Sequence, residues 1–415
     1  MSDNNQSWSN WARNQTCHPK RIVHPTSEND LIAVIADANS EGHTVRMAGS
    51  GHSFSPICVT DGTLIILDQL SGLIDVNSTT RNVRAWAGTR IRDFGPSLWT
   101  AGLCLKNQGD IDTQQIGGAI GTATHGSGID QQSFSATVKS LRIVTATGEV
   151  LEVDARTPEL LAAARVSMGM LGAVTQVDLE TESSFGLRER IEYWHIDEVL
   201  SRWDHEMNEH RHFSFFWMPY EDSPELLFLD TPDGLSMGDR AMVKIYDQLD
   251  IEEIDQNEAH GEHGRRDRPY RIYPDPDFEG EPVNRELEYM VPFAAGKEAF
   301  LALRDLIFRS YPESKFPVEV RSVKGDDAWL SPFYERDSIS ISICGHEDRD
   351  YERFLTDVAR VLDPFEARPH WGKLNYMNRE RLDHLFPKLE AFREVRRRLD
   401  PDGLFLSPAL ATIFA

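Results

Sequence analysis

Residues 48–55 read Ala48-Gly49-Ser50-Gly51-His52-Ser53-Phe54-Ser55, and a second glycine-rich run, GGAIGTATHGSG, extends over residues 117–128. A backbone without bulky side chains can approach a pyrophosphate closely and direct several N–H groups at it. Serine and threonine hydroxyls in both runs add hydrogen-bond donors. Neither run has the nicotinamide-dinucleotide spacing G-x-G-x-x-G or the Walker spacing G-x-x-x-x-G-K-[ST]. The two runs therefore predict a phosphate-bearing cofactor held by some other fold.

Three segments carry a resemblance to a known family. Arg46 to Ser53, followed by Asp61-Gly62, resembles the FAD-binding domain of the vanillyl-alcohol-oxidase superfamily. Residues 114–128 and the stretch Arg368-Pro369-His370-Trp371-Gly372-Lys373 resemble segments of its sugar-1,4-lactone oxidases and alditol oxidases. The resemblance covers nearly the whole chain, with the segments in matching order. It implies an α+β flavoprotein of two domains: a PCMH-type FAD-binding domain at 1–185, a substrate (cap) domain at 186–370, and a C-terminal segment, 371–415, that returns to the FAD domain.

Length and composition predict a soluble protein of two domains. The chain has 415 residues, which is long for a single hydrophobic core. Its 43 basic and 67 acidic residues give a net charge of -24, which disfavours nucleic acid and anionic membranes as partners. The acidity is typical of a well-solvated surface, with steering of a substrate as the alternative. Four cysteines without a C-x-x-C pair, a polar N-terminus and no long apolar run predict a cytoplasmic protein. The oligomeric state stays open.

The hydrophobic pattern divides the chain near residue 185. Before it, expected strands and helices alternate, and one helix begins after Ser27, carries Leu31, Ile35 and Ala38 on one face and ends at Gly42. After it come aromatic-rich strands at 212–217 and 225–229, helices around 296–311 and 348–362, and strands at 316–323 and 338–344. The polar stretch 250–280 is expected to be an exposed insertion.

His52 is the most specific prediction among the cofactor residues. The resemblance implies that its ring is bonded covalently to the flavin; the alternative is a histidine that only caps the loop or contacts bound FAD. For His125 the resemblance implies a structural or pyrophosphate-side role. The full set of predicted cofactor-binding residues is His52, Ala48, Gly49, Ser50, Gly51, Ser53, Gly109, Gln115, Gly118, Thr122, Thr124, His125 and Val174.

The segment Asn107-Gln108-Gly109-Asp110-Ile111-Asp112 resembles the family segment that crosses the reactive side of the flavin. A small residue at the position of Gly109 is thought to admit oxygen, so the resemblance implies an oxidase; a simple turn glycine is the alternative. Asp110 departs from the serine of alditol oxidases and the small residue usual in lactone oxidases. Its carboxylate could accept hydrogen bonds from sugar hydroxyls or cap the following turn.

Two further segments predict catalytic side chains. In Phe316-Pro317-Val318-Glu319-Val320-Arg321 the alternation of a strand places Glu319 and Arg321 on one face. Such a pair is more often a surface salt bridge, but the resemblance places it in the active site. Lys373 would stabilise negative charge on the reduced flavin and on the ionising alcohol; a surface lysine is the alternative.

The strand 338–344 alternates strictly, so that Ser342 and Cys344 share one face. Alditol oxidases have a histidine and a threonine at the aligned positions, and this departure argues against polyol binding. The scattered histidines show no metal spacing such as H-E-x-x-H, and we predict no metal site.

Together these observations predict an FAD-dependent carbohydrate oxidase that uses O2 and forms hydrogen peroxide. Glu319, Arg321, Lys373 and Asp110 are its expected catalytic residues. An aldono-1,4-lactone is the expected substrate. An alditol such as xylitol or sorbitol, or a dehydrogenase with another electron acceptor, is the alternative.

Overall fold

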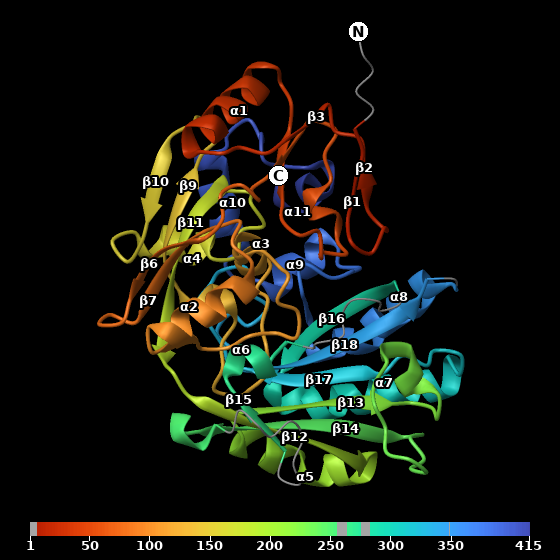
Figure 1. Cartoon of the computed structure of the whole chain (residues 1–415). Helices are drawn as coiled ribbons and strands as arrows, with labels where there is room; N and C mark the ends of the chain where they lie inside the picture. Colours follow the sequence, from red (N-terminus) through yellow and green to blue (C-terminus); the bar gives the residue numbers. More distant parts are fainter. Residues whose placement is uncertain (1–5, 255–263, 275–282, 348) are drawn as a thin grey trace.

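The structure, a computed structural model, describes residues 6–254, 264–274, 283–347 and 349–415. These residues form two units that stack on one another in Figure 1. The upper unit contains β1 to β11 and the C-terminal helices, and the lower unit contains one large sheet. One pocket lies mainly in the upper unit, and a second pocket is lined by residues of both units.

The upper unit is built on two larger sheets, beside a small sheet in which β1 pairs with β2. In the first, β5 (Thr63–Ile66) pairs in parallel with β3 (Arg21–Val23) and β4 (Val45–Ala48). The Ser27 side chain accepts a hydrogen bond from the Asp30 N–H and caps α1 (Glu28–Ser40). The second sheet has the order β10-β9-β11-β7-β6, and β8 also pairs with β11. The other elements here are β1 (Trp8–Ser9), β2 (Thr16–Cys17), β6 (Leu73–Asn77), β7 (Asn82–Trp86), α2 (Phe94–Thr100), β8 (Leu103–Leu105), α3 (Ile116–Gly121), β9 (Val138–Val144), β10 (Val150–Val153), α4 (Pro158–Ala164) and β11 (Ala173–Ser183).

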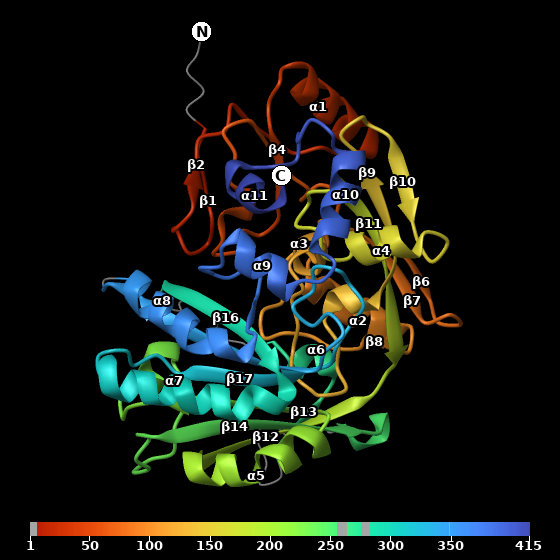
Figure 2. The same cartoon turned by 180° about the vertical axis from the view of Figure 1, so that it is seen from behind.

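The lower unit is an eight-stranded antiparallel sheet with the order β15-β12-β14-β13-β17-β18-β16-β19. Three helices, α5 (Ile196–Glu209), α7 (Gly296–Ser310) and α8 (Tyr351–Leu362), cover one of its faces (Figures 1 and 2). The strands are β12 (Gly186–His195), β13 (His212–Met218), β14 (Arg240–Leu249), β15 (Arg265–Asp267), β16 (Asn284–Pro292), β17 (Val318–Val323), β18 (Ser338–His346) and β19 (Arg368–Pro369).

The two faces of this sheet have different chemistry, because successive side chains of a strand point in opposite directions. On β18, Ile339, Ile341 and Ile343 belong to the apolar core under the helices. Ser342 and Cys344 of the same strand line a pocket instead. The polar face is therefore directed at the upper unit, and it supplies the floor of that pocket.

After β19 the chain returns to the upper unit through α9 (Arg379–Leu385), α10 (Leu389–Leu399) and α11 (Pro408–Phe414). Phe392 of α10 and Phe414 of α11 share a core cluster with Ile116 and Leu161. This clustering ties the C-terminal helices to the second glycine-rich run. Among the described residues no helix has the length and apolar character needed to cross a membrane.

Most predicted elements are confirmed, including α1, α7 and the strands at 318–323 and 338–346. The strand predicted at 225–229 is wrong. The chain instead forms a 3-10 helix, η4 (Ser223–Leu227), with Pro224 in its first turn, and its C-cap Phe228 lies in the left-handed region (φ 50). A short apolar run does not distinguish a strand from such a turn.

The insertion expected at 250–280 falls partly outside the described residues, at 255–263 and 275–280. For residues 264–274 the expected exposed segment is wrong. β15 extends the sheet beside β12, and α6 (Pro269–Ile272) buries Ile272 together with Tyr273. β15 contains no apolar residue and pairs with β12 through its backbone, so the periodicity of apolar residues does not predict this strand.

Candidate active site

The first pocket lies around the two glycine-rich runs. The run that follows β4 and the run that contains α3 line it together with residues 167–169, Gly172 and Val174. Gly51 has a φ of 77°, a conformation that favours glycine. A Cβ added at Gly118 would meet no atom within 4 Å, so the backbone there is open to the cavity. Bare backbone at these positions fits the dinucleotide cofactor that the sequence predicts.

A buried arginine positions the first glycine-rich run. The Arg46 guanidinium donates hydrogen bonds to the backbone carbonyls of Ile57, Phe405 and Met168. These carbonyls belong to three separate segments, one of them near the C-terminus. Arg46 therefore fixes the end of β4, from which the glycine-rich run begins, against the rest of the upper unit.

His52 lies in the wall of the first pocket. Its ring stacks on Trp11, with centroids 5.8 Å apart, and its Nε2 lies 3.0 Å from the Thr113 hydroxyl. Burial and the positive charge of Lys373 lower the pKa of His52 to about 4. The imidazole is therefore neutral at physiological pH, which is the nucleophilic form.

The second pocket lies on the polar face of the large sheet. It shares part of its lining with the first pocket, so the two cavities adjoin. The residues common to both are Ile111, Gln114, Thr124, Asn284, Glu286, His370 and Lys373. Phe216, Leu227 and Leu229 are the large apolar side chains that line the second pocket but not the first.

Arg321 stands at the centre of the charges in the second pocket. Its Nη2 donates to Glu288 Oε1 at 2.7 Å and lies 3.2 Å from Glu319 Oε2, while its Nη1 lies 3.5 Å from Asp110 Oδ2. Lys244 Nζ lies 3.8 Å from the other oxygen of Asp110. The guanidinium is therefore fixed by several carboxylates before any substrate binds.

Glu319 differs from the other carboxylates of this group. Burial, helped by the negative charges of Asp110 and Glu288, outweighs the attraction of Arg321 and raises the pKa of Glu319 to about 8. Its carboxyl group is therefore mostly protonated at pH 7 and can exchange a proton near neutral pH.

Lys373 forms the second charged pair. Its ammonium group donates to Glu286, which also accepts a hydrogen bond of 2.7 Å from the Ser342 hydroxyl. Burial opposes the charge on Lys373, but Glu286 and Glu288 outweigh burial and raise its pKa. Lys373 therefore stays protonated where the two pockets meet.

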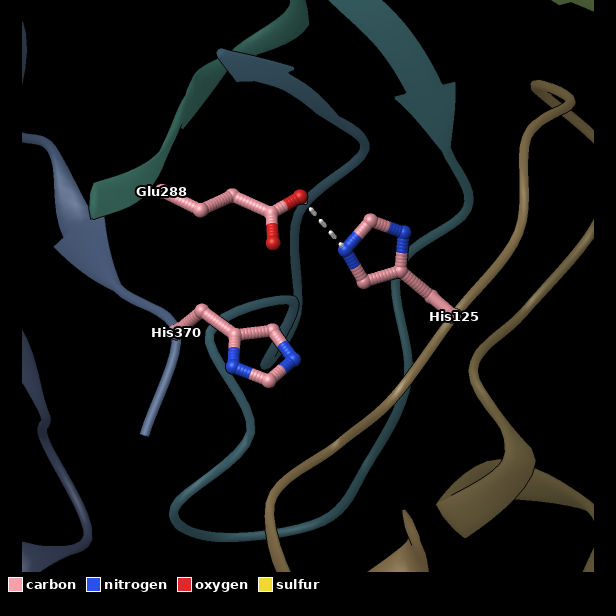
Figure 3. Close-up of side chains that lie close together, drawn as sticks. All are labelled: His125, Glu288 and His370. Atoms are coloured by element: carbon pink, nitrogen blue, oxygen red, sulfur yellow. Dashed lines mark ion pairs between the residues drawn. The ribbon is translucent and has the colours of Figure 1, made fainter. Parts of the chain in front are cut away.

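His125, Glu288 and His370 lie side by side, with one possible ligand atom of each within 4.8 Å of the others (Figure 3). The hydrogen bonds argue against a metal ion there. His370 Nδ1 accepts the Gly372 N–H at 3.0 Å, so its Nε2 carries the proton of the neutral ring. A nitrogen that carries a proton has no lone pair for a metal.

The structure brings the predicted residues together in two groups. Asp110, Glu319, Arg321 and Lys373 all line the second pocket, together with Gly109 and His125. His125 thus lies beside Glu288 rather than in the wall of the first pocket. The remaining predicted cofactor residues line the first pocket: Ala48, Gly49, Ser50, Gly51, His52, Ser53, Gln115, Gly118, Thr122, Thr124 and Val174.

Sequence reasoning missed the contribution of β16. Asn284, Glu286 and Glu288 alternate along this strand and line the second pocket. Lys244 on β14 was missed as well. The alternation of polar residues in Asn284-Arg285-Glu286-Leu287-Glu288 has the same period that identified Glu319 and Arg321, and it was the available signal.

Comparisons with known proteins agree with this geometry. The sequence profile of an FAD-binding domain matches residues 19–154, and that of D-arabinono-1,4-lactone oxidase matches residues 283–413. An L-gulono-1,4-lactone dehydrogenase of Mycobacterium tuberculosis is 36% identical, over 96% of this chain and 97% of the relative. The L-gulonolactone oxidase of Mus musculus is 28% identical, over 98% and 97%.

Two further proteins match this chain over nearly its whole length. An alditol oxidase of Streptomyces sp. is 28% identical, over 97% of both chains. Among solved structures, cholesterol oxidase from B. sterolicum matches with a TM-score of 0.83 at 13% identity, over 99% of this chain and 97% of that one. At this identity the match concerns the fold, and it confirms the predicted α+β architecture of two domains.

Proposed function

Because the chain belongs to the aldonolactone oxidase family of FAD-dependent oxidoreductases, we propose that it oxidises an aldono-1,4-lactone beside the lactone carbonyl and passes the electrons to O2. The observation that supports this proposal is the junction of the two pockets. Glu286, His370 and Lys373 line both cavities. A small polar substrate in the second pocket would therefore adjoin the cofactor in the first.

FAD, when bound, accepts the hydride that leaves the carbinol carbon. The hydroxyl proton needs a separate acceptor, and we assign this role to Glu319, whose pKa of about 8 suits proton exchange near neutral pH. The positive charges of Arg321 and Lys373 stabilise the developing alkoxide. Asp110 accepts hydrogen bonds from the sugar hydroxyls and helps to orient the ring.

We assign covalent attachment of the flavin to His52. A ring whose pKa lies near 4 is neutral and therefore nucleophilic at physiological pH. The contact between Nε2 and Thr113 makes Nδ1 the candidate bonding atom. After precipitation with acid, the yellow colour should stay with the protein, whereas colour in the supernatant would show that the flavin is not covalently bound.

Ser342 and Cys344 in the second pocket support a lactone over an alditol. They stand where the resemblance implies a histidine and a threonine in alditol oxidases. Cys344 offers only a weak donor, and the Ser342 hydroxyl already donates to Glu286, so little donor capacity is left for an extended polyol. The 28% identity to an alditol oxidase over nearly the whole chain keeps alditols as the second candidate.

Gly109 supports oxygen as the acceptor, because the family segment that it matches is thought to govern oxygen access. The 36% identical relative is named a dehydrogenase, and a protein acceptor or dye is therefore the alternative.

The experiment is anaerobic addition of fresh aldono-1,4-lactones, xylitol and sorbitol to the purified enzyme, followed by admission of air. We expect lactones to bleach the flavin absorbance, and air to restore it within seconds with formation of hydrogen peroxide. Bleaching by the polyols alone would refute the lactone assignment, and slow return of colour in air would refute the oxidase assignment.

A further inference from the structure

His125 lines the second pocket beside Glu288, and the proposed oxidation gives it no role. It is 4% exposed, and the Phe333 ring packs edge-on against it with centroids 5.0 Å apart. His125 Nδ1 lies 2.8 Å from the Gly126 carbonyl oxygen. Because a carbonyl only accepts, Nδ1 must carry a proton.

The other ring nitrogen faces a carboxylate. His125 Nε2 lies 3.1 Å from Glu288 Oε1 at the end of the dashed line in Figure 3. The contact is an ion pair rather than a well-aligned hydrogen bond, since Nε2 has no partner of good hydrogen-bond geometry among the described residues. Two lone pairs at this distance in a buried site would repel one another, so one of the two atoms must carry a proton.

The neighbours of Glu288 indicate which atom holds this proton. The same Oε1 accepts hydrogen bonds from Arg321 Nη2 and the Ser340 hydroxyl. An oxygen with two such donors is a poor site for a third proton. Glu288 is thus a carboxylate.

We propose that His125 is a positively charged positioning residue of the oxidation reaction, which acts through Glu288 on Arg321. This inference rests on the proposed function. With His125 cationic, the pair His125–Glu288 is neutral, and Arg321 keeps its charge for the reacting oxygen and for Glu319. Without that charge, Glu288 would neutralise Arg321 and leave the pocket more negative by one unit, which opposes formation of an alkoxide.

The charged groups around His125 come from three elements. Glu288 lies on β16, Arg321 and Glu319 lie on β17, and His370 and Lys373 lie on the segment that follows β19. Of these, His370 is neutral, because burial lowers its pKa to about 3. Asp110 reaches the cluster through Arg321. His125 is thus the group that can balance Glu288 without drawing charge from Arg321.

The segment 107–112 approaches the backbone of His125 at Gly109. A Cβ at Gly109 would lie 2.9 Å from the His125 carbonyl oxygen, which is closer than real Cβ contacts come. The small residue at position 109 therefore also allows the close backbone approach that places the His125 ring against Glu288.

The test is a double-mutant cycle of His125→Gln and Glu288→Gln, read by the limiting rate of anaerobic flavin reduction by lactone and by the thermal midpoint of the holoenzyme. His125→Gln leaves a carboxylate without its cation, and we expect at least a ten-fold slower reduction and a lower midpoint. The double variant is neutral and nearly isosteric, and the amide introduced by Glu288→Gln still offers Arg321 an oxygen. We expect the double variant to reduce at least three-fold faster than His125→Gln and to regain much of the lost midpoint.

His212→Gln is the matched control. His212 is equally buried between the Ser127 carbonyl and the Tyr273 hydroxyl and lines neither pocket. It should lower the midpoint without slowing flavin reduction. If the double variant is no faster than His125→Gln, or if His125→Gln reduces at the wild-type rate, the proposal is overturned.

Two outcomes separate this inference from the proposed function. If no lactone reduces the wild-type flavin, the proposed function fails, and the midpoints alone then decide whether the charged pair exists. If lactone reduces the wild type but the cycle shows no recovery in rate, His125 has only a structural role and the function stands.

Discussion

Glu319→Gln tests the assignment of the proton acceptor, because it keeps the size of the side chain and removes its ability to take up a proton. In the wild type, burial and the charges of Asp110 and Glu288 raise the pKa of Glu319 to about 8. At pH 7 roughly one molecule in ten then carries the ionised carboxylate. The second-order rate constant for flavin reduction should therefore rise about ten-fold per pH unit below 8 and become constant above pH 9.

The size of the effect should itself depend on pH. Loss of a positioned general base costs roughly 10²- to 10⁴-fold in rate. This full loss should appear at pH 9, where Glu319 of the wild type is ionised. At pH 7 only about a tenth of the wild-type molecules carry the ionised Glu319. The ratio of the rate constants for flavin reduction, wild type to variant, should therefore be about ten-fold smaller than at pH 9.

The assay is anaerobic stopped-flow reduction of the flavin between pH 6 and 10, in single turnovers with freshly dissolved lactone because lactones hydrolyse in base. Glu298→Gln, which removes an exposed carboxylate on α7, is the control for net charge. A flat wild-type profile from pH 6 to 9, or an unchanged pH dependence in Glu319→Gln, would refute the role of Glu319 as proton acceptor.

Three further predictions concern the other assigned residues. His52→Ala should release the flavin into the supernatant on acid precipitation; colour that stays in the pellet would place the bond elsewhere. Lys373→Met leaves Glu286 with the Ser342 hydroxyl but without its cation, and flavin reduction should slow by about 10²- to 10³-fold, with a smaller loss for Lys373→Arg. A loss below ten-fold for Lys373→Met would mean that Arg321 alone stabilises the alkoxide. Gly109→Ala should slow both reduction by lactone and reoxidation by O2, since its Cβ would meet the His125 carbonyl at 2.9 Å; an effect on reoxidation alone would show that this residue governs only oxygen access.

Most of the fold and many of the residues that line both pockets could be predicted from the sequence. Glycine-rich runs constrain the backbone locally, and the spacing of Glu319 and Arg321 follows from the period of a strand. These local rules, together with the family resemblance, named residues that line the two pockets.

The missing part of the site depends on contacts between distant segments. Glu288 contacts His125, which lies 163 positions earlier in the sequence (288 minus 125). Glu288 on β16 also contacts Arg321 on β17, although these two strands are not adjacent in the sheet. Sheet order decides these contacts, and local patterns carry no information on it. For the same reason the resemblance, which implies a structural or pyrophosphate-side role for His125, does not predict its contact with Glu288.

The error at 225–229 has a different origin. Leu227 and Leu229 are apolar because they form a wall of the second pocket. The run of apolar residues therefore predicted a strand where the chain forms a turn that lines the second pocket. The lining of a cavity, and not a strand, accounts for the apolar side chains here.

The central claim is that a lactone in the second pocket reduces the flavin in the first and that O2 reoxidises it. Double-mixing stopped flow tests it most directly: the enzyme is first mixed anaerobically with an aldono-1,4-lactone, and the reduced enzyme is then mixed with buffer that contains O2. The account predicts full bleaching of the flavin, then rapid return of its absorbance with one hydrogen peroxide per lactone oxidised. A flavin that stays oxidised with every lactone, and that only dithionite or a polyol bleaches, would contradict it.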